Sequence, residues 1–224
     1  MSIEREILNR QLNQILESIE NARVRSANRN KVTLVAVTKG EQAPRIQTLY
    51  DLGVRHFGEN RVHVAEPKIA SLSLRESVWH MIGNVQRRKA RDVVALFDRI
   101  DAVDRLELAV ALSERCEAAG ERIPCLLEVN VSGETSKHGF PPEDLERAID
   151  SIQSLPGIVV EGVMTMAPYS EDPERARPHF ARLRCIADKL GLTRVSMGMS
   201  NDFVVAVEEG STEVRIGSAL FKGL

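Results

Sequence analysis

The sequence predicts an α/β fold in which eight parallel strands alternate with helices and close into a single (β/α)8 barrel. Short β-branched runs alternate with longer amphipathic stretches, which is the pattern of βα units around a parallel sheet. Eight such runs can be counted, and no GxGxxG motif follows any of them, which disfavours the alternative of a doubly wound open sheet. No Gly/Ser-rich linker divides the 224 residues, so we expect residues 1–224 to form one domain.

The expected elements follow one another in a regular order. Leu8, Leu12, Ile15 and Ile19 have helical spacing and predict an extra N-terminal helix before the first strand. The eight strands are expected at residues 32–38, 54–57, 78–82, 99–103, 123–131, 158–164, 194–197 and 213–216. Helical patterns fill nearly every gap between these strands.

Two segments predict where helices begin. Asp104 followed by Glu107 resembles a capping box, in which the two side chains satisfy free amides of the first turn. Pro141 and Pro142 precede two acidic residues, and proline suits the first turn of a helix because its missing amide is not needed there. We therefore expect helices after the fourth and fifth strands.

Composition excludes several classes of function. The formal net charge is -2, from 30 basic and 32 acidic residues, so no global field attracts nucleic acid or anionic membrane. Cys116, Cys125 and Cys185 show neither a metal-ligand spacing nor an even count, which argues against structural zinc and a disulfide framework. No apolar run has membrane-spanning length and the N-terminal segment is not signal-like, so we expect a cytoplasmic protein.

The expected strand ends are unusually polar. In a (β/α)8 barrel the carboxyl ends of all strands converge on one face, where functional side chains gather. Here those ends are Thr38-Lys39-Gly40, Gly58-Glu59-Asn60, Ile82-Gly83-Asn84, residues 101–104, residues 130–132, Met164-Thr165-Met166, Met199-Ser200-Asn201 and Gly217-Ser218. Polar residues and glycines at so many ends predict a ligand pocket on this face.

Lys39 directly follows the first strand. An amine at the mouth of a barrel would be partly desolvated, which favours the neutral form that attacks a carbonyl carbon. Schiff-base chemistry is therefore the first hypothesis for Lys39, and a solvated lysine in a loop is the alternative.

Two strand ends predict a phosphate site. Ser200 is expected to be the N-cap of a helix that begins near residues 201–203, where its hydroxyl and the next amides would face an anion. Gly217 and Ser218 offer a second set of amides, because glycine lets the backbone approach a phosphate closely. The alternatives are an ordinary cap and an ordinary turn, but barrels often bind phosphate beside their last two strands.

Arg215 lies two residues before Gly217 in the last strand, so both are expected to face the same pocket. Arginine keeps its proton in proteins, so a ring nitrogen bonded to it would stay unprotonated and accept the hydrogen bond. The alternative is an ion pair inside the barrel with Glu161 or Glu128.

A lysine, hydrogen-bond donors for a phosphate and a partner for a ring nitrogen are the groups that bind pyridoxal 5'-phosphate (PLP), and all are expected at one barrel mouth. Seven segments, spread over nearly the whole chain, then show that the sequence resembles the pyridoxal phosphate homeostasis protein family. They are Val35-Ala36-Val37-Thr38-Lys39, His56-Phe57-Gly58-Glu59-Asn60-Arg61, Trp79-His80-Met81-Ile82-Gly83, Glu128-Val129-Asn130-Val131-Ser132, Ser136-Lys137-His138-Gly139, Ser196-Met197-Gly198-Met199-Ser200 and Val214-Arg215-Ile216-Gly217-Ser218.

The resemblance implies a PLP barrel of fold type III, similar to the N-terminal domain of alanine racemase. The cofactor-binding residues that it implies are Lys39, Asn60, Ser200, Arg215, Gly217 and Ser218. Lys39 would hold the cofactor as an internal aldimine, Arg215 would face the pyridine nitrogen, and Asn60 would be a polar group near the ring. The serines and the glycine at the ends of strands seven and eight would contact the phosphate.

The resemblance also points to His80 and Met199, and it places Lys137 as a second amine near the aldehyde, although a solvated loop lysine is the alternative. The segment after Gly83 departs from the family, because residues 84–89 read Asn-Val-Gln-Arg-Arg-Lys where many relatives carry histidine and then leucine. This departure concerns the rim of the pocket.

The expected function is a PLP carrier without catalytic turnover. Racemases of similar fold add a second domain that supplies a tyrosine base, and none is expected here, although Tyr169 follows strand six and could stand near the rim. The alternatives are a small racemase-like enzyme and a regulatory module. In the regulatory module, the basic run at residues 87–91 could contact a protein partner. The expected partners are PLP and PLP-dependent apoenzymes or a regulatory protein, with the chain a monomer.

Overall fold

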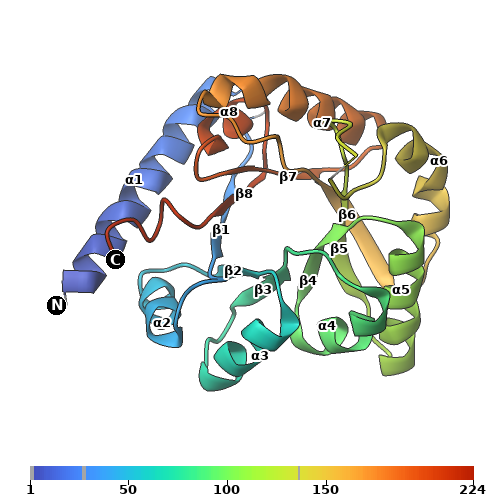
Figure 1. Ribbon diagram of the computed structural model, residues 1–224, viewed down its shortest axis with the longest axis horizontal. Coiled ribbons are helices and arrows are strands. Elements are labelled where there is room, and N and C mark those ends of the chain that lie inside the picture. Colours follow the sequence, from blue (N-terminus) through green and yellow to red (C-terminus); the bar gives the residue numbers. More distant parts are fainter. Residues whose placement is uncertain (1–2, 27–28, 136) are drawn as a thin grey trace.

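The computed structural model describes residues 3–26, 29–135 and 137–224, and its centre is a closed barrel of parallel strands (Figure 1). The strands pair in chain order and β8 pairs with β1, which closes the sheet. Their bounds are β1 (Thr33–Val37), β2 (His56–Glu59), β3 (Val78–Met81), β4 (Arg99–Val103), β5 (Ile123–Glu128), β6 (Ile158–Met164), β7 (Arg194–Met199) and β8 (Glu213–Ile216). The predicted (β/α)8 barrel is therefore confirmed.

Helices surround the barrel as an outer ring (Figure 1). They are α1 (Ile3–Arg25), α2 (Ala43–Asp51), α3 (Val62–Ser71), α4 (Ala90–Leu96), α5 (Leu106–Ala119), α6 (Pro142–Gln153), α7 (Arg177–Lys189) and α8 (Phe203–Glu208), with short 3-10 turns η1 (Arg87–Lys89) and η2 (Pro173–Ala176). Within these described residues, none of the helices is long and apolar enough to cross a membrane.

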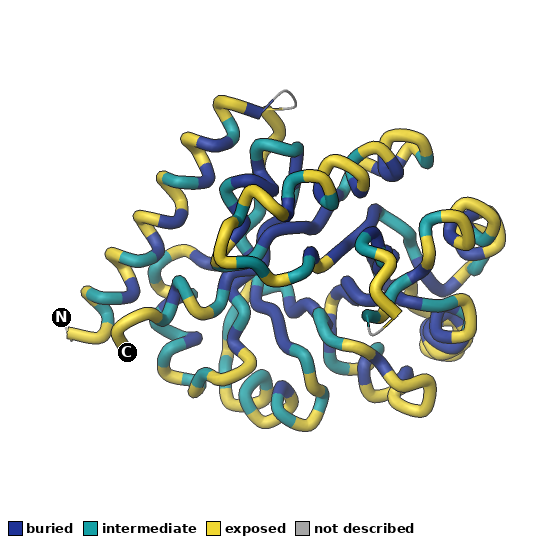
Figure 2. The backbone as a smooth tube through the Cα atoms, turned by 45° about the horizontal axis from the view of Figure 1, so that its top comes forward, coloured by how far each residue is buried: buried dark blue, intermediate teal, exposed yellow. Residues whose placement is uncertain are grey.

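The extra helix α1 is confirmed, and it packs beside α8 (Figure 1). Its four predicted apolar residues are all buried, and Figure 2 shows buried and exposed positions alternating along it as expected for one covered face. Arg25, in its last turn, pairs with Glu208 of α8 at 2.7 Å.

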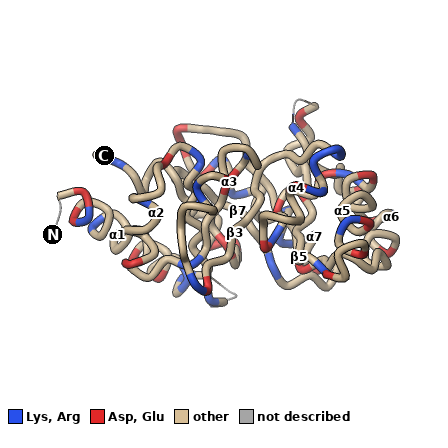
Figure 3. The backbone as a smooth tube through the Cα atoms, turned by 90° about the horizontal axis from the view of Figure 1, so that it is seen from below, with Lys and Arg blue, Asp and Glu red and all other residues tan. Residues whose placement is uncertain are grey.

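The outer helices carry basic and acidic residues interspersed, without a face of one sign in the view of Figure 3. This distribution agrees with the near-neutral composition. Cys116, Cys125 and Cys185 are all unpaired, in agreement with the expectation that they form no disulfide framework.

Some expected element ends were wrong, for local reasons. Strand β5 stops at Glu128, not at residue 131, because Val129 and the following chain bridge to Phe140. The capping box is also wrong: α5 begins at Leu106 after Arg105, and the carboxylate of Asp104 instead accepts hydrogen bonds from the side chains of Asn84 and Arg105. The proline signal is confirmed, since α6 starts at Pro142.

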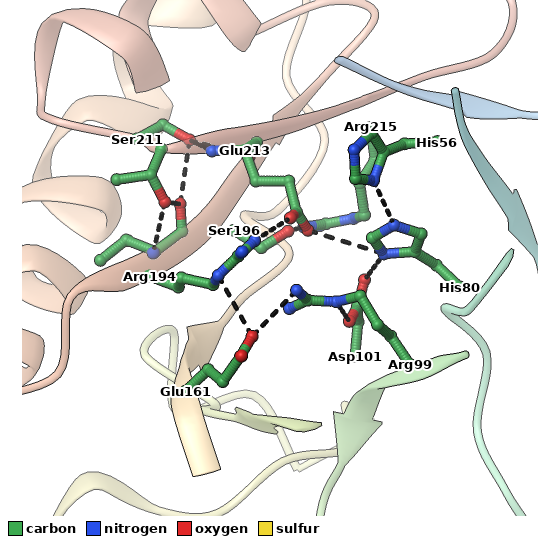
Figure 4. Close-up of polar contacts among 12 residues, drawn as sticks. His56, His80, Arg99, Asp101, Glu161, Arg194, Ser196, Ser211, Glu213 and Arg215 are labelled. Atoms are coloured by element: carbon green, nitrogen blue, oxygen red, sulfur yellow. Dashed lines mark hydrogen bonds and ion pairs between the residues drawn. The ribbon is translucent and has the colours of Figure 1, made fainter. Parts of the chain in front are cut away.

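A network of charged side chains lies inside the barrel (Figure 4). Arg99 and Arg194 lie 2.9 and 3.1 Å from Glu161. Asp101 lies 3.5 Å from Arg99, and Glu213 lies 3.6 Å from Arg194. The opposite charges offset one another, which lets the barrel bury Arg99, Asp101 and Glu213, while Glu161 and Arg194 are half-buried.

His80 completes this buried network. Its Nδ1 lies 2.6 Å from Asp101, and its Nε2 lies 2.9 Å from Nδ1 of His56. Ligand-type atoms of His80, Asp101 and Glu213 lie within 4.8 Å of one another, which is a spacing that suits a metal ion. Both carboxylates already face guanidinium groups, however, so the negative charge that would attract a cation is largely neutralised.

His56 makes the network sensitive to acid. Its pKa is lowered to about 4, first because burial disfavours the charged ring and then because His80, Arg99 and Arg194 repel the charge, while Asp101 opposes the shift. Unfolded His56 binds a proton near pH 6.5, whereas the folded protein resists it until about pH 4. Between pH 6.5 and about pH 4 the unfolded chain therefore binds a proton that the folded protein does not, which stabilises the unfolded state.

We expect the free energy of unfolding to fall as the pH drops from about 6.5 to about 4, and His56→Asn to flatten this part of the profile. Asparagine does not titrate, so the difference between the two profiles isolates His56 from the carboxylates. Urea denaturation at a series of pH values measures both, and parallel profiles would contradict the assignment.

Gly83 follows β3 and lets the chain pass against Asn60. A Cβ at Gly83 would lie 2.5 Å from the carbonyl oxygen of Asn60 and 2.8 Å from its Cα, which are backbone atoms that cannot turn away. The glycine therefore fixes how closely the ends of β2 and β3 approach.

Gly83→Ala is expected to destabilise the protein by about 1–3 kcal/mol, because the backbone of Asn60 must shift. Gly40→Ala is the matched control, since no atom lies within 4 Å of its Cβ position. Urea denaturation of the two variants compares them, and an equal loss of stability would refute this role of Gly83.

Candidate functional site

A cavity of about 480 Å³ opens at the carboxyl ends of the strands, and all of the cofactor-binding residues predicted from the sequence line it. These residues are Lys39, Asn60, Ser200, Arg215, Gly217 and Ser218. Its volume lies within the range of pockets for small ligands and cofactors. A larger cleft of about 690 Å³ lies beside α3 and α4 and shares Asn60 and Asn84 with the cavity, but it contains neither Lys39 nor Arg215.

Lys39 lies in the turn that follows β1 and is exposed. The structure differs here from the expected partial desolvation, because the buried residue at this strand end is the preceding Thr38. The amine thus stands on the wall of the cavity in contact with water. An amine in this position is accessible to an aldehyde that enters the cavity.

Ser200 organises the end of the cavity nearest β7 and β8. Its Oγ accepts hydrogen bonds from the backbone amides of Gly217, at 3.3 Å, and Ala219, at 3.2 Å. The predicted N-cap role is wrong, because α8 begins at Phe203 after Asp202.

The amides of Gly217 and Ala219 converge on one oxygen, the hydroxyl of Ser200, and the same two N–H groups would suit a phosphate oxygen that replaced this hydroxyl. Sequence reasoning missed Ala219, because its contribution is a backbone amide. Its place right after Gly217-Ser218 was the only sequence signal. Ser218 itself is exposed on the wall of the cavity.

Arg215 is almost fully buried at the floor of the cavity. Its guanidinium donates to Oγ of Ser196 at 2.7 Å and to the carbonyl oxygen of Thr165 at 2.9 Å. The alternative of an ion pair with Glu161 is not found, because Glu161 pairs with Arg99 and Arg194. Both of these hydrogen-bond acceptors are neutral groups, so the positive charge of Arg215 remains available to the cavity.

Glu128 also lines the cavity, and burial raises the pKa of its carboxyl, assisted by repulsion from Asp104 and opposed by Arg215. A direct ion pair of Glu128 with Arg215 is not recorded in the part of the chain that the structure describes.

Of the two further residues that the family resemblance suggested, only one reaches the cavity. Met199 lines it, whereas His80 lies deeper in the barrel, in the charged network (Figure 4). Tyr169 stands at the rim as expected, 83% exposed. Its phenol is therefore mostly in water.

Lys137 lines a neighbouring cavity of about 360 Å³ that shares Glu128, His138 and Tyr169 with the main one. Its Nζ donates to the carbonyl oxygen of Met166 at 3.3 Å. The second amine is thus next to the main cavity but outside its lining. Ser136, in the same motif, lies outside the described residues.

The residues that are present fit PLP chemically. An accessible amine suits the aldehyde, two converging backbone amides suit the phosphate, and a buried guanidinium suits an acceptor nitrogen of a ring. Lys39, Arg215 and Gly217 all line one cavity of suitable volume.

Comparisons with known proteins agree with this chemistry. The family model described as alanine racemase, N-terminal domain, matches residues 11–224. The pyridoxal phosphate homeostasis protein of Aquifex aeolicus is 37% identical over 217 residues, which cover 94% of this chain and 95% of the relative. That of Pseudomonas aeruginosa is 42% identical over 194 residues, or 85% of this chain and 84% of the relative.

A solved structure gives the same result. PipY of Synechococcus elongatus, determined with PLP bound, is 32% identical and superposes with a TM-score of 0.84, covering 96% of this chain and 99% of that one. The sequence identity, the coverage and the shared barrel show that this chain belongs to the pyridoxal phosphate homeostasis protein family.

Proposed function

We propose that this protein binds PLP in the cavity at the barrel mouth and acts as a carrier in PLP homeostasis without catalytic turnover. The observation that carries the proposal is the meeting of Lys39, Gly217 and Arg215 on one cavity. The amide of Ala219 lies beside that of Gly217, since both donate to Ser200. The PLP bound to PipY, in the same family and fold, supports it.

Each residue has a proposed role. Lys39 would hold the cofactor covalently through its amine, because an amine joins an aldehyde with loss of water. Ser200, Gly217 and Ser218, together with the amide of Ala219, would bind the phosphate. Asn60 would lie beside the ring.

Arg215 would face the pyridine nitrogen and donate a hydrogen bond to it. Because the guanidinium keeps its proton, the nitrogen stays unprotonated and withdraws electrons less strongly from the reacting carbon. Bound PLP supplies an electron sink in amino-acid chemistry, and this arrangement would weaken it. A cofactor that withdraws electrons weakly is better suited to being stored on the protein than to catalysing amino-acid reactions.

Release would reverse attachment at Lys39. Water or an incoming amine would displace Lys39, which would return to a free amine, and the aldehyde would depart either unchanged or attached to the new amine. The exposed position of Lys39 supports such exchange with solution.

The chain would act in the cytoplasm as one monomeric domain and would pass PLP to apoenzymes or respond to a regulatory protein. Its three unpaired cysteines are consistent with a reducing compartment.

A racemase-like enzyme is the second candidate, and Tyr169 favours it. This phenol lines the same cavity as Lys39 and could exchange a proton with a bound amino acid. Its high exposure argues against a tuned base. Exchange of the α-hydrogen of alanine with deuterated solvent, followed by NMR, would distinguish an enzyme from a carrier.

Wild-type protein is expected to form a visible absorbance band with PLP that borohydride traps, and Lys39→Ala is expected to lose both. Lys31→Ala is the matched control, since Lys31 is an exposed lysine just before the opposite end of the same strand. Mass spectrometry of the reduced protein locates the adduct. An adduct elsewhere in wild type, or none, would overturn the role of Lys39.

Arg215→Lys is expected to weaken PLP binding about tenfold, because lysine keeps the charge but cannot reproduce the two hydrogen bonds that orient the guanidinium. The visible band should also shift as the ring nitrogen changes its protonation. Titration with PLP, paired with thermal unfolding of the cofactor-free variant, measures both effects. Unchanged affinity and spectrum in a folded variant would exclude contact with the ring nitrogen.

A further inference from the structure

A buried ion pair lies directly beneath the turn that carries Lys39. Glu59, at the end of β2, accepts a hydrogen bond from Nζ of Lys68 at 2.8 Å, and Lys68 comes from α3. The side chain of Glu59 is 0% exposed and that of Lys68 is 13% exposed. The cavity at the barrel mouth does not include either residue in its lining.

This pair is joined to the backbone at Lys39 through Thr38. Nζ of Lys68 donates a second hydrogen bond, at 2.8 Å, to the carbonyl oxygen of Thr38, which belongs to the peptide group that leads into Lys39. The hydroxyl of Thr38 donates to Oε1 of Glu59 at 2.7 Å. The same carbonyl closes the turn around Lys39 and Gly40 by accepting from the amide of Glu41 at 2.9 Å.

Glu59, the acidic member of the ion pair, is also adjacent in sequence to a residue that lines the cavity. This residue is Asn60, which lines the cavity at the end of β2, the strand paired with β1. Glu59 is the residue before Asn60, and its Oε1 accepts hydrogen bonds from Thr38, the residue before Lys39, and from Lys68.

We propose that Lys68 and Glu59 are positioning residues that hold the peptide group of Lys39 and the backbone of Asn60 in the geometry needed to attach PLP. The inference rests on the proposed function of Lys39. Neither residue touches the cofactor in this scheme; each acts through Thr38 or Asn60.

The burial of this charge favours a positioning role over a contribution to stability alone. A buried ion pair contributes little net stability compared with apolar side chains of similar size, yet it fixes direction through its hydrogen bonds. Oε2 of Glu59 is buried without a hydrogen-bond partner, so all of the recorded contacts of this carboxylate converge on Oε1. An attacking amine displaced by about 1 Å loses much of its reactivity, which makes such fixation useful.

Lys68→Met tests the inference in the full-length chain, because methionine keeps the apolar stem and removes the donor. We expect PLP affinity to fall about tenfold, equivalent to 1.4 kcal/mol, and a smaller share of the bound PLP to be trapped on Lys39 by borohydride. Lys68→Arg, which can donate to both acceptors, should restore most of the attachment. Lys89→Met is the matched control, since Lys89 pairs with Asp92 at the same kind of distance, 2.9 Å, but on the exposed surface of η1 and α4.

A purely structural role would lower the melting temperature without PLP but leave the trapped share unchanged. If Lys68→Met does not fold, the double variant Lys68→Met/Glu59→Gln decides, because it leaves no unpaired buried charge. A folded variant that attaches PLP to Lys39 as completely as wild type would overturn the inference. If wild type itself attaches no PLP to Lys39, the proposed function fails instead, so the two failures are distinguishable.

Discussion

The pairing of β8 with β1 is the interaction on which the site depends. These strands are the last and the first of the barrel, and their register places Val35 opposite Arg215 and Ala36 opposite Ile216. The chain leaves both strands at the same end, so Lys39 follows one and Gly217 follows the other. Closure of the sheet therefore brings an amine, a guanidinium and a pair of amides together from opposite ends of the sequence.

The interior of the barrel shows how these charges are tolerated. Arginines and carboxylates face one another inside the barrel, so this largely buried network is close to neutral (Figure 4). Arg215 lies above it and donates to Ser196 and to the carbonyl of Thr165. The carboxylates of Asp101 and Glu213 stabilise its charged form from a distance, while its hydrogen bonds go to neutral groups. The positive charge of Arg215 can therefore act on the cavity.

The sequence was sufficient to predict the barrel and the gathering of the site residues, because buried strands and their polar ends leave a periodic signal and parallel strands end on one face. It was insufficient for contacts that depend on side-chain direction. Asp104 and Ser200 were expected to cap helices, but both oxygens bond to other donors nearby. The contact of Lys68 with Thr38 joins a helix to a strand end thirty residues earlier, and such a contact leaves no pattern in sequence.

The exposure of Lys39 bears on how long a ligand stays. If Lys39 holds the aldehyde as proposed, water and dissolved amines can reach the carbon bonded to its nitrogen by the route through which the aldehyde entered. The residence time on the protein is then governed by competition among nucleophiles in solution rather than by a slow opening of the fold. Such a site responds to the composition of its surroundings, and its occupancy follows the supply and demand for the aldehyde on the timescale of chemical exchange.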